Sequence, residues 1–76
     1  MIPLSTLKAG DRARVEAIAG EPALVQRLYE FGLLEGEEVE LLAVAPLGDP
    51  VEIRIGNTRL SLRLREADGV TVSILR

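Results

Sequence analysis

Apolar and polar residues alternate along two separate stretches of the chain, residues 12–19 and 38–45. A period of two is typical of a strand that buries one face, so each stretch is predicted to be a half-buried β-strand. The residues expected to face inward are Ala13, Val15 and Ala17 in the first stretch and Val39, Leu41 and Ala43 in the second.

A β-hairpin is predicted over residues 51–62. Two alternating stretches, 51–55 and 58–62, flank Gly56-Asn57, a two-residue connection suited to a primed turn. A loop of this length sets the register of the two strands. The expected cross-strand pairs, all on one face, are Ile55 with Thr58, Ile53 with Leu60, and Val51 with Leu62. Residues 66–69 are predicted to form a turn or a single helical turn, and residues 70–74 a last strand.

One short helix is predicted between the first two strands. Leu24, Leu28 and Phe31 recur at positions i, i+4 and i+7, so one helical face is apolar. Gly32 suits the left-handed residue that ends many helices, and Leu33 beyond it is placed to contact Leu28. About five short strands with one helix after the first predict a mainly β fold, bent into a small barrel that hides most of its edges.

Length and composition limit the chain to a single domain over residues 1–76. The 47% of hydrophobic residues include one Phe, one Tyr and no Trp, so the core must be aliphatic. The longest apolar run, residues 41–47, is far shorter than the roughly twenty residues of a spanning helix. The N-terminus shows no signal-peptide pattern. We therefore expect a cytoplasmic domain without direct membrane insertion.

Little in the sequence points to catalysis or metal binding. There is no His and no Cys, so no enzyme activity and no cofactor are predicted. Four glutamates lie close together in sequence, but strand alternation sends Glu37 to the opposite face from Glu38 and Glu40, so no stable metal site is predicted. The net charge of −3 and the scarcity of aromatic residues argue against a nucleic-acid partner.

Several arginines are predicted on the outward face of the hairpin. Arg54 lies opposite Arg59, with Arg63 and Arg65 further along. Like charges facing each other across strands are destabilising, which indicates a basic strip that orients a protein partner. The alternative is a solvated wall in which carboxylates such as Glu40, expected opposite Arg54, neutralise the strip.

Two groups of apolar residues are candidates for partner binding. Tyr29, Leu33 and Leu34 lie at the end of the helix, and Leu42, Val44 and Leu47 lie along and beyond the second strand. If Leu42 and Val44 point outward, this second group forms an exposed apolar patch of the kind that marks an interface. Alternatively, a β-bulge turns Leu42 and Val44 inward.

The order of these features resembles the FeoA family. The residues that carry the resemblance are Leu4 and Leu7 before Gly10, Arg27-Leu28, Gly32-Leu33, Gly36, the segment from Ala45 to Pro50, Leu60-Ser61-Leu62-Arg63 and Glu66-Ala67. The resemblance implies an SH3-like barrel. It also implies a small non-enzymatic accessory of FeoB, the membrane ferrous-iron transporter, recognised through its cytosolic GTP-binding domain.

Two alternatives accompany this hypothesis. The same barrel is similar to the C-terminal domain of metal-dependent transcriptional repressors, although such a regulator needs a helix-turn-helix for which this sequence has no room. The other alternative is a barrel that associates with itself into homo-oligomers.

Overall fold

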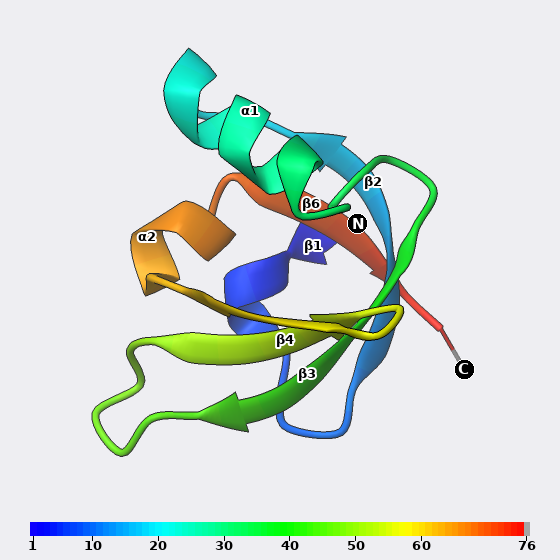
Figure 1. The fold of residues 1–76 in the computed structure, drawn as a ribbon. Coiled ribbons are helices and arrows are strands. Elements are labelled where there is room, and N and C mark those ends of the chain that lie inside the picture. Colours follow the sequence, from blue (N-terminus) through cyan, green and yellow to red (C-terminus); the bar gives the residue numbers. More distant parts are fainter. Residues whose placement is uncertain (76) are drawn as a thin grey trace.

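The alternating segments form one antiparallel sheet in the computed structural model, which describes residues 1–75 (Figure 1). The sheet order is β1-β6-β2-β3-β4-β5, and the sheet is curled rather than closed, so β1 and β5 are its edges. The elements are β1 (Ile2–Pro3), a 3-10 turn η1 (Leu4–Thr6), β2 (Arg12–Ile18), α1 (Pro22–Glu30), β3 (Glu38–Val44), β4 (Val51–Ile55), β5 (Thr58–Leu62), α2 (Leu64–Ala67) and β6 (Val70–Ile74).

The mainly β class and the helix after the first long strand are confirmed. The sheet has one strand more than the five predicted. This additional strand, β1, was not expected because two residues are too few to show an alternating pattern. It pairs with β6 through Ile2 and Pro3. The helical turn near residues 66–69 is present as α2, two residues earlier than predicted. No helix within residues 1–75 has the length and apolar character needed to cross a membrane.

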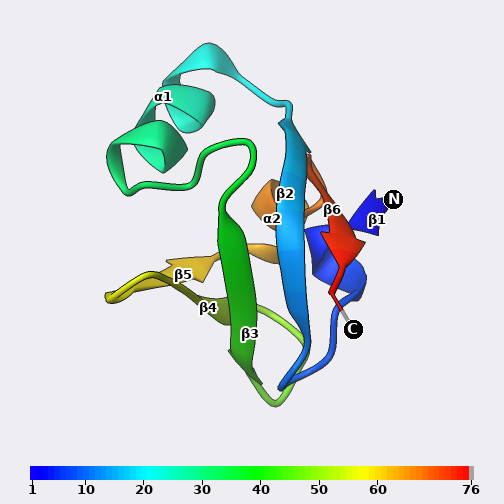
Figure 2. The same cartoon turned by 90° about the vertical axis from the view of Figure 1, so that its right-hand side faces the viewer.

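The curvature of the sheet wraps it around an aliphatic core. Figure 2 shows β2, β3 and β6 side by side while the β4–β5 hairpin leaves their plane, and α1 covers the open upper end. No polar or charged side chain among the described residues is buried. The buried residues are Leu4, Leu7, Ala13, Val15, Leu28, Leu33, Val39, Leu41, Val51, Ile53, Ile55, Leu62, Ala67, Val70 and Val72.

Two irregularities in the pairing of the strands explain why some residues predicted to face inward are exposed. The register shifts between Val15 and Ala17 in β2, and between Leu41 and Ala43 in β3. Each shift ends the alternation, so Ala17 and Ala43 are exposed although both were expected inside. Bulges of this kind increase the local bend and twist of a sheet.

The hairpin register is confirmed in every predicted pair, from Ile55 opposite Thr58 to Val51 opposite Leu62. Gly56 has φ of +57°, and Asn57 does not have a positive φ, which is the pattern of a type II′ turn. Glu40 lies opposite Arg54, also as predicted.

The end of α1 is a Schellman cap, as the position of Gly32 predicted. Gly32 has φ of +94°, its N–H donates to the Tyr29 carbonyl at 2.9 Å, and the Leu33 N–H donates to the Leu28 carbonyl at 2.9 Å. This turn drives Leu33 into the core beside Leu28, where its side chain is 0% exposed. The prediction that Leu33 belongs to a partner-binding surface is therefore wrong, because its side chain has no surface to offer.

Leu33→Ala and Leu34→Ala form a matched pair that tests this placement. Leu33→Ala should lower the free energy of unfolding by about 2–5 kcal/mol, because it leaves a cavity in the core. Leu34 is 42% exposed, so its truncation should cost less than about 1 kcal/mol. Urea unfolding followed by circular dichroism measures both changes, and equal losses for the two variants would contradict the assigned burial.

Candidate functional site

Apart from Met1 and Ile74, the large apolar residues exposed within residues 1–75 lie at the end of α1 or between the end of β3 and the loop after it. Tyr29 is 38% exposed and Leu34 42%, while Val44 is 43% and Leu47 97% exposed. Leu42 is half-buried, so the bulge in β3 turns Leu42 partly inward but leaves Val44 at the surface. Of the two interpretations of this segment, the exposed patch holds for Val44 and Leu47.

Phe31 is a surface residue that the sequence pattern did not indicate. Its spacing from Leu24 and Leu28 predicted a buried position, but α1 ends at Glu30 and Phe31 is 44% exposed. Because the chain leaves the helix at Gly32, the Phe31 ring lies beside the sheet instead of beneath it. No signal in the local sequence distinguishes these two outcomes.

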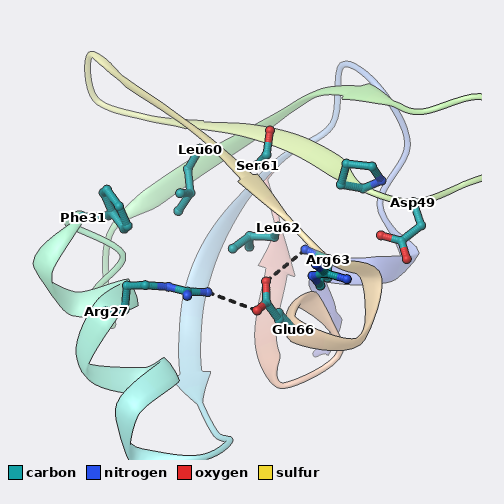
Figure 3. Close-up of a pocket in the computed structure, with 9 residues that line it drawn as sticks. Arg27, Phe31, Asp49, Leu60, Ser61, Leu62, Arg63 and Glu66 are labelled. Atoms are coloured by element: carbon teal, nitrogen blue, oxygen red, sulfur yellow. Dashed lines mark hydrogen bonds and ion pairs between the residues drawn. The ribbon is translucent and has the colours of Figure 1, made fainter.

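A groove of about 690 Å³ lies between the end of α1, β5 and α2 (Figure 3). Its lining comes from four separate parts of the chain, which only the fold brings together. The lining residues are Arg27, Phe31, Asp49, Pro50, Leu60, Ser61, Leu62, Arg63 and Glu66. Among these, only Arg63 was a candidate site residue from sequence; the others were missed because their neighbourhood depends on tertiary packing.

Glu66 organises one end of this groove. One carboxylate oxygen lies 3.1 Å from an Arg27 guanidinium nitrogen, and the other accepts the backbone N–H of Arg63 at 3.0 Å (Figure 3). Nearby, Asp49 accepts the backbone N–H of Leu64 at 3.0 Å. These contacts tie α1 and the loop before β4 to the start of α2, so the groove has polar walls around the apolar surface of Phe31 and Leu60.

The predicted arginine strip is present but divided. Arg54 lies opposite Arg59 and is neutralised by Glu40, whose carboxylate is 2.6 Å away. Arg59 and Arg63 have no carboxylate within 4.0 Å in the part of the chain that the structure describes. The ion-paired interpretation therefore holds for Arg54, while Arg59 and Arg63 remain available cations.

Tyr29 makes a side-chain contact with the loop that follows α1. Its hydroxyl donates a hydrogen bond to the Glu35 carboxylate at 3.0 Å. This hydrogen bond, with smaller contributions from partial burial and from the negative charge of Glu35, raises the pKa of Tyr29 above its ordinary value. The contact requires the protonated hydroxyl of Tyr29. Its contribution to the stability of the fold is therefore fully present below the pKa of a free tyrosine, and it is lost as the pH rises through the pKa of Tyr29 in the folded protein.

The chain has one Tyr and no Trp, so the absorbance change of tyrosinate reports this residue alone. A spectrophotometric titration should place the Tyr29 pKa above that of a free tyrosine. Glu35→Gln should lower the pKa, whereas Glu37→Gln, two residues away, should change it less. A Tyr29 pKa at or below the free value would contradict the contact.

Metal ligands do not gather anywhere in residues 1–75: no three of the His, Cys, Asp and Glu side chains there are arranged to hold an ion.

The fold is shared with solved structures of known relatives. The solution structure of the FeoA protein from Chlorobium tepidum superposes with a TM-score of 0.95 at 48% identity, over 99% of this chain and 71% of that one. The crystal structure of FeoA from Stenotrophomonas maltophilia, complexed with zinc and described as a prokaryotic SH3 domain protein, gives 0.83 at 36% identity, over 96% and 91%. A manganese-dependent transcriptional repressor shares the fold, with a TM-score of 0.87 at 19% identity over 96% of this chain and 41% of the repressor.

Sequence comparison agrees with the structures. A protein of Porphyromonas gingivalis, an Fe(2+) transport protein A/Fe(2+) transporter FeoB fusion, is 33% identical over 72 residues. That match covers 95% of this chain, which spans only 8% of the length of the fusion protein. The model of the FeoA domain matches residues 2–74. The chain, with its SH3-like barrel, belongs to the FeoA family.

Proposed function

We propose that this chain is a non-enzymatic accessory of ferrous iron transport that works in the cytoplasm by binding the GTP-binding portion of a FeoB-type transporter. The observation that carries the proposal is the fusion protein, in which a sequence similar to nearly all of this chain is covalently joined to FeoB. Fusion keeps two domains at a high effective concentration. Separate chains of the same kind are then expected to meet by binding.

The exposed apolar residues supply the contact surface in this proposal. Leu47 is 97% exposed in the loop between β3 and β4, and Val44 is the last residue of β3 before this loop. Burying a leucine side chain of this kind contributes about 1.5–3 kcal/mol. Tyr29, Phe31 and Leu34 at the end of α1 form a second apolar group, of the residue types that often anchor interfaces.

Regulation follows from differential affinity. A bound accessory protein shifts a transporter between two states only to the extent that it binds one state more tightly than the other. A FeoB-type transporter that binds GTP passes through at least two nucleotide states. The proposal therefore requires that the affinity of this chain for the transporter depend on the bound nucleotide.

The likeness to transcriptional repressors concerns the fold alone. It does not favour a second function over transport. Self-association is the alternative, and a mass measurement of the chain in solution distinguishes it.

Calorimetric titration of this chain with the cytosolic portion of its cognate FeoB, with GDP and with a GTP analogue, tests the proposal. Saturable binding is expected, with different affinities in the two nucleotide states. Leu47→Ser should weaken the binding about tenfold, which corresponds to about 1.4 kcal/mol.

Ile74→Ser is the matched control, since Ile74 is an aliphatic residue 39% exposed on β6, and it should leave the affinity unchanged. Native affinity in the Leu47→Ser variant would rule out the loop surface. Absence of binding in both nucleotide states would overturn the proposed function itself.

A further inference from the structure

The two edges of the sheet are protected to very different degrees. An exposed strand edge carries unpaired N–H and C=O groups that attract another strand, and proteins usually blunt it with proline, bulges or a very short strand. The β1 edge is two residues long and contains Pro3. The β5 edge is five residues long, has no proline, and pairs with β4 without any register shift.

The hairpin register shows which backbone groups of β5 face outward. The pair that closes a two-residue hairpin exchanges backbone hydrogen bonds, and every second pair along the ladder does the same. Thr58, Leu60 and Leu62 therefore bond to β4, which leaves the N–H and C=O groups of Arg59 and Ser61 directed away from the sheet.

The backbone N–H of Arg63 independently supports this assignment of inward and outward groups. It is the next residue in the outward series, and its backbone N–H does point away from β4, where the Glu66 carboxylate accepts it at 3.0 Å. The open edge is thus limited to Arg59 and Ser61, and Glu66 closes its far end. Glu66 thus satisfies the outward N–H of Arg63, whereas the outward N–H and C=O of Ser61, which lines the groove, have no partner within the described residues.

The groove follows this edge. A groove on one face of a strand is lined by every second residue, because neighbouring side chains point to opposite faces. Here four consecutive residues, Leu60 to Arg63, line it. Such a lining means that the groove runs beside the strand, at the edge itself, with Phe31 and Arg27 of the α1 end as part of its wall (Figure 3).

We propose that this groove binds an extended acidic peptide segment, which adds to β5 as a seventh strand. The backbone groups of Arg59 and Ser61 supply the hydrogen bonds, as in other complexes formed by strand addition. On one face of the added strand, acidic side chains meet the guanidinium groups of Arg59 and Arg63, which have no ion-pair partner within residues 1–75. On its other face, apolar side chains meet Leu60, which is half-buried, and Phe31.

Charge distinguishes this occupant from a second copy of the chain. Two copies paired through β5 would gather Arg59 and Arg63 of both chains on one face of the joined sheet. Like charges on neighbouring strands are destabilising, whereas opposite charges each contribute roughly 0.2–1 kcal/mol. Asp49 and Glu66 also line the groove, but each accepts a backbone N–H, and Glu66 is paired with Arg27. The cations left without an ion pair within residues 1–75 at this edge are Arg59 and Arg63, and they favour an acidic ligand.

A designed peptide tests the proposal without any transporter, so its result is independent of the proposed function. The probe is an N-acetylated, C-amidated octapeptide of alternating Val and Glu, titrated into the ¹⁵N-labelled chain and followed by NMR. Hydrogen exchange of the Arg59 and Ser61 amides should slow on binding, while the Thr58 and Leu60 amides, already bonded to β4, change little. The octapeptide of alternating Val and Lys should not bind.

Backbone N-methylation supplies the sharpest control. In the added strand, every second N–H group faces β5, so the N–H groups that bond to β5 belong either to the Val residues or to the Glu residues. N-methylation of one of these two sets should abolish binding, and N-methylation of the other set should not affect it. On the protein side, Ser61→Pro removes an outward donor and should weaken binding. Replacing Arg59 and Arg63 together by Gln should weaken it by up to about tenfold, whereas Arg14→Gln on β2 should not.

Three results would overturn the proposal. The first is binding without slower exchange at Arg59 and Ser61. The second is equal affinity for the Glu and Lys peptides. The third is protection of the β5 edge in the absence of peptide together with a doubled mass in solution, which would assign the edge to a second copy of the chain.

Discussion

The burial of Leu28 and Leu33 at the end of α1 is the interaction on which the rest of the surface depends. A sheet of this size cannot close around its core alone, and α1 covers the open end by placing these two leucines inside. Because the Schellman turn at Gly32 fixes the direction in which the chain leaves the helix, the same turn that buries Leu33 exposes Phe31 and Leu34. The wall of the groove is thus a consequence of how the core is sealed.

The bend of the sheet has a similar double effect. Bulges in β2 and β3 increase the curvature that a barrel needs, and each one interrupts the alternation of buried and exposed residues. In β3 the interruption leaves Val44 at the surface, and the chain then continues outward to Leu47. An apolar side chain that is exposed at a loop tip does not stabilise the fold by burial. Leu47 is therefore a strong candidate for a recognition surface.

The arrangement of charges separates structural from available groups. Arg54 and Arg27 are each paired with a glutamate: the first pair joins the neighbouring strands β3 and β4, and the second joins α1 to α2. Exposed pairs of this kind contribute little to stability, but the Arg27–Glu66 pair orders side chains that line the groove. Within residues 1–75, Arg59 and Arg63 lie on the same surface without such partners, so an acidic chain presents a basic edge along β5, the longer of the two edge strands.

The sequence by itself determined the five longer strands, the hairpin register, the helix cap and the family. These features depend on local rules: alternation needs only one buried face, a two-residue turn permits one register, and a glycine is needed where φ is positive. The tertiary structure decided that Leu33 is buried and Phe31 exposed, that bulges expose Ala17 and Ala43, and which arginines are paired. It also assembled the groove from residues as far apart as Arg27 and Glu66. Such outcomes depend on how distant elements pack, and a residue's burial is set by neighbours that its own segment of sequence does not contain.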